Sequence, residues 1–446
     1  GPACSTELVD TVDRVSTKSW DEKTVTARCQ TLIDFGVVKK ERSTLSLQPD
    51  PTDVLSAEQL QQLAEYARFS SSVTYPRIAG SFLTRTLERK LYAQGVELPQ
   101  TPAFLLRHNS YHNCLDEELV YQSTRLACLE MIKTGTTTFN DHYWHMPEGY
   151  KAALEMGIRG VHAYVILDRN DPEESERQKI QCQEMYEVAK AWGVTSTFSI
   201  AIHAIYSVRE EMFVWATNFA RERGLKIHIH LSETRKEVED CKAQHGGMSP
   251  VEYLDSLGVL GPDVIAAHTL WLSENDIEIL GKRGVNCVHN VNSNLKLASG
   301  YKFLYNELRD AGANICLGTD GSASSNNLDM LETMKTSAMI QKAWRDDPTA
   351  MPLPELMDMA TANGGKALGL KVGKIEKGYL ADILIVDTQG YSFVSPGSFD
   401  ANFVYASHAD CIESVICNGK FVMRNRVVPN EAQILKEAKE TLKKLL

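Results

Sequence analysis

The residues best suited to chemistry lie in the stretch Lys226–Thr234, which reads KIHIHLSET. Isoleucines alternate with His228 and His230, a period of two that is typical of a strand, and Glu233 follows in a polar turn. An imidazole can bind a metal or shuttle protons, and a nearby carboxylate can act as a general acid and base. Taken alone, the pattern also fits a buried strand whose two histidines are satisfied by hydrogen bonds.

Other polar residues follow other short apolar runs in the same way. They are His203 after residues 196–202, His268 after 264–267, His289 after 286–288 and Asp320 after 314–318. Similar runs at 136–139 and 160–167 complete a set of seven expected strands. Helical patterns separate them at 116–134, 147–156, 172–192, 209–223, 249–257, 273–283 and 304–311.

This regular alternation predicts the fold class. Strands that alternate with helices across short loops form a parallel sheet, and at least seven such units in a row predict a (β/α)₈ barrel of the TIM type. Active-site residues in that fold come from the C-terminal ends of the strands. We therefore expect His203, His230, His268 and Asp320 to share one site.

Composition sets wider bounds. The length of 446 residues fits a barrel plus accessory parts, and the net charge of −11 argues against a nucleic-acid backbone as the main partner. The sequence contains no run of 18 apolar residues, so no membrane span is expected. Its ten cysteines form no CxxC pair, which suits a reduced, cytoplasmic protein.

Four regions are expected along the chain. Residues 1–70 form a divergent N-terminal region, with strands near 32–38 and 43–47 and a helix over 56–69. The barrel spans 71–368 and ends in helices over 330–344 and 353–368. A small β domain over 369–430 is predicted from strand patterns at 372–387 and 412–428, and the remaining residues, 431–446, form a C-terminal helix.

Several longer segments resemble one family. They are GTTTFND at 135–141, HAIYSV at 203–208, HIHLSET at 228–234, AAHTLWLS at 266–273, HNVNSNLKLASG at 289–300, LGTDGSASSNNLDM at 317–330 and GKIEKGYLADILIVD at 373–387. In order and spacing these resemble the amidohydrolase superfamily, in the branch of methylthioadenosine/S-adenosylhomocysteine deaminases and related chlorohydrolases. The resemblance covers roughly residues 110–430.

The resemblance implies a role for each matching residue. His230 and Asp320 would bind one divalent metal, zinc or iron, and Asp320 would also take a proton from the metal's water. Glu233 would protonate the ring nitrogen or the leaving group, and His268 would orient the water or the tetrahedral intermediate. His203 would contact the substrate. These roles agree with the chemistry of the residues, since a metal-bound water is a nucleophile near neutral pH and a carboxylate can handle its protons.

One part of the family pattern is missing. The family's other two metal ligands form an HxH motif at the end of strand one, but no histidine precedes His108 here. In the best local match, residues 74–85, Pro76 and Ile78 occupy the histidine places. A catalytic zinc normally has three protein ligands, so the site either lacks metal or is rebuilt. His268, the pair His142 and His145, or the pair His108 and His112 are the candidate replacements. A second departure is Val291-Asn292, where the family commonly has Pro-Ser.

Three functions remain open from the sequence. The first is a metal-dependent aminohydrolase acting on a purine-like or other heteroaromatic small molecule. The second is a repurposed barrel with little or no metal, which uses Glu233, His268 and Asp320 for a non-hydrolytic cyclisation, isomerisation or elimination. The third is a non-catalytic homologue. A small-molecule substrate is the expected partner, with neither nucleic acid nor membrane, and the resemblance implies a homodimer.

Overall fold

The computed structural model describes residues 3–4, 38–41, 44–47, 116–191 and 197–443. The chain divides into two compact units, residues 1–115 with 442–446, and residues 116–441. In the first unit three short strands form an antiparallel sheet in the order β1-β3-β2: β1 (Ala3–Cys4), β2 (Val38–Glu41) and β3 (Thr44–Leu47). The expected strand at 43–47 is confirmed as β3. The expected helix at 56–69, the segment 74–85, and His108 with His112 lie outside the described residues.

The second unit is built on one parallel sheet of seven strands. They are β4 (Thr138–Asn140), β5 (Arg159–Ile166), β6 (Phe198–Ile202), β7 (Lys226–Leu231), β8 (Val264–His268), β9 (Asn286–His289) and β10 (Asn314–Leu317). Each strand pairs with the next one along the chain, so the sheet runs from β4 to β10 in sequence order. Consecutive parallel strands joined by helices are the topology of a (β/α)₈ barrel, which confirms the predicted fold class. The expected first strand falls upstream of residue 116, outside the described residues.

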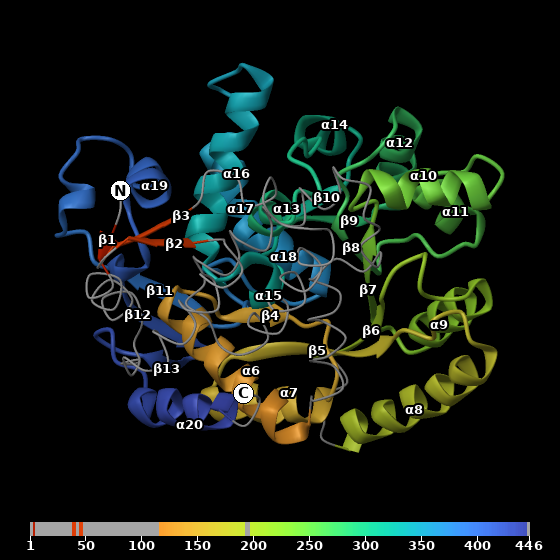
Figure 1. The fold of residues 1–446 in the computed structure, drawn as a ribbon, viewed down its shortest axis with the longest axis horizontal. Helices are drawn as coiled ribbons and strands as arrows, with labels where there is room; N and C mark the ends of the chain where they lie inside the picture. Colours follow the sequence, from red (N-terminus) through yellow and green to blue (C-terminus); the bar gives the residue numbers. More distant parts are fainter. Residues whose placement is uncertain (1–2, 5–37, 42–43, 48–115, 192–196, 444–446) are drawn as a thin grey trace. The chain divides into compact units, whose positions relative to one another are not determined.

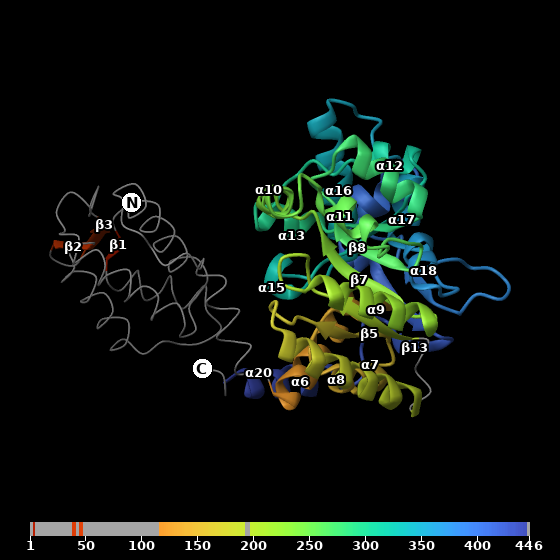
Figure 2. The same ribbon diagram turned by 90° about the vertical axis from the view of Figure 1, so that its right-hand side faces the viewer.

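Helices precede, connect and follow these strands, and several of them cover the outer side of the sheet (Figure 1). They are α6 (Glu117–Lys133), α7 (Met146–Met156), α8 (Pro172–Ala191), α9 (Glu210–Glu222), α10 (Arg235–Gln244), α11 (Pro250–Ser256), α12 (Glu274–Arg283), α13 (Val291–Lys296), α14 (Tyr305–Asp310), α15 (Ser322–Ser325) and α16 (Met330–Arg345). Figure 2 shows α9, α11 and α12 on the outer side of β7 and β8. Every residue of β6 and β8 is buried, because these strands are covered on both faces.

Local sequence signals fix where the helices begin and end. Ser249 and Ser273 each begin a helix with a capping box, in which the serine and an acidic residue three positions later satisfy each other's backbone N–H groups. Gly157 and Gly284 end α7 and α12 in the left-handed conformation, with φ of 73° and 68°, which glycine adopts without a steric cost. These signals explain why the predicted elements match closely along this part of the chain.

One predicted helix is wrong in its extent. The helix expected over 353–368 is two helices, α17 (Leu353–Ala360) and α18 (Ala362–Leu368), which meet at Thr361 with ψ of −89°. Asn363, in the first turn of α18, donates a hydrogen bond to the carbonyl of Ile315 and accepts one from the side chain of Asn314. These contacts with β10 fix α18 in its own direction, which the helical pattern of the sequence could not reveal.

A small antiparallel sheet follows the barrel, in the order β11-β12-β13. Its strands are β11 (Ile383–Val386), β12 (Ile412–Cys417) and β13 (Lys420–Met423), and short helices stand between the first two: η3 (Tyr391–Phe393), α19 (Phe399–Ala401), η4 (Asn402–Ala406) and η5 (Ala409–Cys411). A buried ion pair connects this sheet to the barrel, because Arg159 at the start of β5 contacts both carboxylate oxygens of Asp382.

The last helix, α20 (Glu431–Lys443), packs beside α6. Arg125 of α6 forms ion pairs with Glu437 of α20 and with Glu155 of α7, and Lys133 contacts Glu431 at 3.0 Å. Within the described ranges no helix is both long and apolar enough to cross a membrane. The compact unit 116–441 contains the barrel strands, the small sheet and most of α20, and the finer domain boundaries expected from the sequence remain predictions.

Candidate active site

The four residues expected to share a site, together with Glu233, meet at the C-terminal ends of the barrel strands. The ring centroids of His203 and His230 are 5.3 Å apart, and those of His230 and His268 are 5.5 Å apart. The Nε2 atom of His268 lies 3.8 Å from Glu233 Oε2 and 4.0 Å from Asp320 Oδ2. Residues from four different strands therefore converge, as the strand-end pattern predicted.

A hydrogen bond to Asn294 holds the ring of His268 in one orientation. Its side chain is only 2% exposed, and Nδ1 is 2.8 Å from the Oδ1 atom of Asn294 on α13. Because an amide oxygen can only accept, Nδ1 carries a proton, and Nε2 is the nitrogen that faces the two carboxylates. Asn294 thus sets which nitrogen of His268 faces the site.

Each of the two carboxylates is fixed by a serine hydroxyl. Ser299 donates to Glu233 Oε1 at 2.9 Å, and Ser293 donates to Asp320 Oδ2 at 2.6 Å. The backbone N–H of Gly321 also donates to Asp320 Oδ1 at 2.5 Å. Both serines come from the segment that contains α13 and its following loop, so this one segment positions both carboxylates.

A second glutamate, Glu237, holds the turn that carries Glu233 through hydrogen bonds to its backbone. The two oxygens of Glu237, on α10, accept the backbone N–H groups of Ser232 and Glu233, each at 2.8 Å. Burial is the main cause that raises the pKa of Glu237 to about 7, although these hydrogen bonds favour its charged form. Glu237 therefore changes charge near neutral pH at a point that shapes the site.

The side chain of His230 is hydrogen-bonded to the backbone of His203. The Nδ1 atom of His230 donates to the carbonyl of His203 at 2.8 Å, and Nδ1 of His203 is 2.8 Å from the hydroxyl of Ser207. Burial, followed by the nearby His268, lowers the pKa of His230. His230 is thus a neutral imidazole whose remaining nitrogen, Nε2, is available on the site side.

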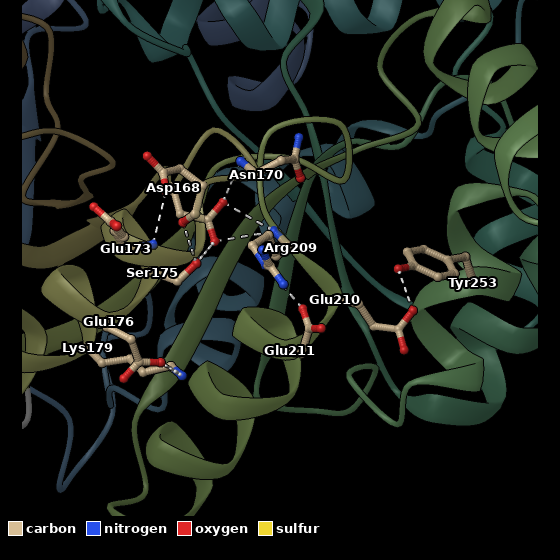
Figure 3. Close-up of polar contacts among 11 residues, drawn as sticks. Asp168, Asn170, Glu173, Ser175, Glu176, Lys179, Arg209, Glu210, Glu211 and Tyr253 are labelled. Carbon is tan, nitrogen blue, oxygen red and sulfur yellow. Dashed lines mark hydrogen bonds and ion pairs between the residues drawn. The ribbon is translucent and has the colours of Figure 1, made fainter.

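A buried carboxylate braces the loop that carries His203 (Figure 3). Asp168, just after β5, is fully buried and accepts hydrogen bonds from the hydroxyl of Ser175 and from the backbone N–H groups of Asn170 and Arg209. In turn, the backbone N–H of Arg169 donates to the carbonyl of Ser207 at 3.0 Å. The loop after β5 therefore holds the loop after β6, which contains both His203 and its partner Ser207.

The structure separates the pair His142 and His145. The ring of His142, just after β4, packs against the imidazoles of His230 and His228, with centroids 4.5 Å and 4.8 Å apart. Burial, and then His230, lowers the pKa of His142 well below its usual value. His145 is exposed and begins α7 in the left-handed conformation, with φ of 54°. Only the first of the two belongs to the site.

Strained backbone accompanies the site. Ser232, His268 and Asp320 have φ of 52°, 76° and 59°, in the left-handed region that residues with a side chain rarely adopt. All three lie at or just beyond strand ends: His268 and Asp320 are themselves expected site residues, and Ser232 adjoins Glu233. Strain of this kind costs of order 1–3 kcal/mol per residue and persists only where the surroundings impose it.

Whether these side chains can hold a divalent metal depends on their donor atoms. In both His230 and His268 the Nδ1 atom is occupied by a hydrogen bond, so Nε2 is the nitrogen left to bind a metal. Asp320 adds a carboxylate. Neutral imidazoles with a carboxylate suit zinc or iron. In the described ranges, no three His, Cys, Asp or Glu side chains already surround one point as metal ligands do. The donors are therefore right in kind, and their side chains must turn to gather around a metal.

Several of these residues had no assigned role in the sequence analysis. Ser293, Asn294 and Ser299 all lie inside the segment HNVNSNLKLASG, and Glu237 lies shortly after HIHLSET. Their signal was the polar character of the segments that follow the strand ends. Val291, one of the two departures from the family pattern, is buried and begins α13, while the side-chain nitrogen of Asn292 is buried without a partner among the described residues.

A separate hollow of about 650 Å³ lies at the opposite end of the strands. Its lining includes Arg221, Lys226 and Asp263, and none of the site residues. Arg221 is already engaged by Asp263 and by the carbonyls of Gly258 and Val259. We therefore place the chemistry at the C-terminal ends of the strands and not in this hollow.

Comparison with known proteins places the chain in a family. The model of the amidohydrolase family matches residues 85–422. A 5'-deoxyadenosine deaminase from Methanoregula boonei is 45% identical over 322 residues, which cover 72% of each chain. A 5-methylthioadenosine/S-adenosylhomocysteine deaminase from Archaeoglobus fulgidus is 40% identical over 74% of this chain and 78% of its own.

Solved structures agree with these relatives. An adenosine deaminase from Xanthomonas campestris with bound zinc matches with a TM-score of 0.69 and 30% identity, over 74% of this chain and 76% of that one. An atrazine chlorohydrolase from Arthrobacter aurescens, also with zinc, has a TM-score of 0.69 over 76% of this chain and 82% of its own, but its 19% identity shows the fold alone. The chain belongs to the amidohydrolase family, in the branch of the methylthioadenosine and S-adenosylhomocysteine deaminases, as the sequence motifs predicted.

Proposed function

We propose that this protein is an aminohydrolase that removes ammonia from the adenine ring of an adenosine-type nucleoside. In this reaction a carbon–oxygen bond forms at the ring carbon that bears the amino group, and the carbon–nitrogen bond breaks. Water supplies the oxygen, and ammonia leaves. The relatives named above as deaminases of 5'-deoxyadenosine and of methylthioadenosine support this substrate class.

The observation that carries the proposal is the pair of carboxylates that faces one imidazole nitrogen. Glu233 and Asp320 lie 3.8 Å and 4.0 Å from His268 Nε2, and a serine hydroxyl fixes one oxygen of each. Two carboxylates on either side of a hydrogen-bonding group can act as acid and base on the same reacting centre. A site that only binds a ligand does not need this arrangement.

Each residue has a distinct task in the proposed reaction. Asp320 accepts a proton from the attacking water, and His268 holds that water beside the ring carbon. Glu233 gives a proton to the ring nitrogen and takes back the proton of the new hydroxyl group as the carbonyl forms, while Asp320 passes the water's proton to the departing amino group. His203, with Ser207 at its Nδ1 atom, contacts the substrate.

The family implies a divalent metal, and the fit described above supports one. His230 and Asp320 are the residues of this chain proposed to hold it. The chemistry that a bound divalent metal supplies to such a site is the activation of water near neutral pH. Neither its identity nor its occupancy is needed for the roles given to Glu233 and His268.

The test is release of ammonia from a small panel of nucleosides. Purified protein is incubated with 5'-deoxyadenosine, methylthioadenosine, S-adenosylhomocysteine and adenosine, and ammonia is measured together with the ultraviolet change from adenine to hypoxanthine. We expect turnover of at least one, abolished in Glu233→Gln and retained in Glu239→Gln, an exposed glutamate on α10. The proposal fails if none of the four is deaminated.

The same experiment separates the alternatives. Chemistry without ammonia release that survives a chelator but is lost in Glu233→Gln would favour the metal-free acid–base enzyme. Binding of a nucleoside without any Glu233-dependent turnover would favour the non-catalytic homologue. We also propose a homodimer as the assembly, which light scattering of the eluted protein would check through its molar mass.

A further inference from the structure

We propose that His142 is a ligand of the metal in this site, where it takes the place of imidazoles that the chain lacks upstream. The proposal rests on the proposed function, which supplies the expectation of a metal. It concerns a residue at the end of β4, outside the set carried over from the family motifs. Its support is the surroundings of this one side chain.

The position of His142 is the first argument. Its ring lies 4.5 Å from that of His230, 4.8 Å from that of His228 and 6.2 Å from that of His203, measured between centroids. His230 in turn stacks with His268. These five imidazoles gathered at the mouth of one barrel are an unusual concentration of nitrogen donors, and His142 is in contact with three of the other four.

The second argument is that both ring nitrogens of His142 are buried without a partner among the described residues. A buried polar atom that makes no hydrogen bond destabilises the folded state, so such an atom calls for a ligand. His162 and His289 share this property within the described ranges. However, the ring of His162 makes edge-on contacts with Phe139 and Tyr150, and the ring of His289 stacks on that of Phe303, with centroids 4.2 Å apart. Of these three histidines, only His142 lies against His230.

The third argument is freedom to turn. The Nδ1 atoms of His228, His230 and His268 are each within 3.0 Å of a hydrogen-bond partner, which restrains those rings. His142 can rotate about its side-chain bond without breaking any hydrogen bond that the described residues provide. Since the donors do not yet surround one point, the ligand that can turn at the lowest cost is the one best able to complete the site.

The count of donors is the fourth argument. His230 and Asp320 alone provide two protein ligands, whereas a catalytic zinc usually has three. His268 has its Nε2 atom turned toward the two carboxylates and is proposed above to hold water. With no histidine before His108 in the chain, His142 is the nearest imidazole to His230 for which the structure gives no other function.

Metal binding can be measured without any turnover. Full-length protein is stripped with a chelator and reloaded with Co²⁺ or Zn²⁺, and the bound metal is counted by mass spectrometry after dialysis. We expect about one equivalent in the wild type and at least about tenfold weaker binding in His142→Ala, with a similar loss in His230→Ala. His145→Ala is the matched control, because His145 lies in the same loop and is exposed, and it should keep the metal.

A second variant, His142→Cys, tests the proposal through a new absorption band and not through a loss of binding. His142→Cys places a thiolate donor at this position, and a thiolate bound to Co²⁺ absorbs in the near ultraviolet. A new absorption band in His142→Cys, absent from the cobalt-loaded wild type, would place the side chain of residue 142 on the metal even if His142→Ala folds poorly. Circular dichroism of each variant verifies the fold.

The outcomes separate this inference from the proposed function. Full metal retention in His142→Ala, with no new band in His142→Cys, would overturn the role of His142 and leave the deaminase intact. A wild type that binds neither metal would overturn the inference as well. The ammonia assay then decides independently whether the protein is a deaminase.

Discussion

The hydroxyl of Ser299 donates a hydrogen bond to Glu233 Oε1 at 2.9 Å, while the other oxygen of Glu233 faces His268 at 3.8 Å. The carbonyl of Ser299 is also tied down, because it accepts the indole N–H of Trp271 at 2.7 Å. The loop after α13 therefore orients Glu233, the proposed acid, through the carboxylate oxygen that does not face His268. Removing the hydroxyl should let the Glu233 side chain leave the orientation that the reaction needs.

We expect Ser299→Ala to lower kcat by up to about tenfold with little change in KM, since a hydrogen bond contributes roughly 0.5–1.5 kcal/mol and about 1.4 kcal/mol corresponds to a factor of ten in rate. Steady-state deamination kinetics on the best nucleoside substrate provide the measurement. Ser256→Ala is the control, because that hydroxyl bonds to the carbonyl of Tyr253 on α11 and should leave both constants unchanged. An equal loss in the two variants would contradict the positioning role.

Asp168→Asn should raise KM several-fold more than it lowers kcat. Its carboxylate accepts hydrogen bonds through both oxygens, and an amide has only one acceptor, so the loops that hold His203 should loosen. The same kinetic experiment measures the split between the two constants. Asp171→Asn, an exposed carboxylate at the start of α8, is the matched control. A change in kcat alone would show that Asp168 does not act through substrate contact.

The buried carboxyl of Glu237 predicts a pH dependence of stability. Its folded pKa of about 7 is higher than the usual value of about 4.5 for a glutamate, mainly because the carboxyl is buried. A carboxyl group with a raised pKa favours the native state while it is protonated, so its contribution falls as pH rises from about 4.5 to about 7. Relative to Glu237→Gln, the wild type should lose up to about 3 kcal/mol of unfolding free energy over this interval, since one pKa unit is worth about 1.4 kcal/mol.

Urea unfolding of both proteins at about pH 5 and about pH 8 would show this difference, because groups that titrate alike in the two proteins cancel. Parallel pH profiles of the wild type and Glu237→Gln would mean that Glu237 is already ionised in the native state at the lower pH.

The ion pair between Arg159 and Asp382 should matter far more than a surface pair. The side chains are 12% and 3% exposed, so Asp382→Ala leaves a buried guanidinium without its partner and should cost about 3–5 kcal/mol of unfolding free energy. Asp263→Ala breaks the pair with Arg221, whose side chain is 39% exposed, and should cost about 1 kcal/mol or less. Thermal or urea unfolding compares the two, and similar losses would argue against a special link between barrel and small sheet.

Much of this architecture could be predicted because it depends on short-range patterns. The seven strands and most connecting helices follow from periodicity and from caps such as Gly157 and Ser249. Placing His203, His268 and Asp320 at strand ends then required only the rule that parallel strands end on one side of a barrel. Family motifs added the roles, and the comparisons confirm the family.

What the sequence could not reveal depends on directions in space. The stretch Val291–Asn294 is rich in poor helix formers, so the short helix α13 was not expected, and with it Ser293 and Asn294 were missed. His142 and His145 are three positions apart and chemically identical. Which one enters the site depends on the turn at His145, whose positive φ no local pattern predicts.

The positive φ values at Ser232, His268 and Asp320 bear on how this protein would respond to selection for heat resistance. At each position glycine or asparagine would relieve the backbone, so a screen for thermal tolerance alone should favour changes there. Two of those changes would delete a side chain to which chemistry is assigned, and the third adjoins Glu233. Directed evolution for thermal stability should therefore select inactive variants first, unless each round also selects for turnover.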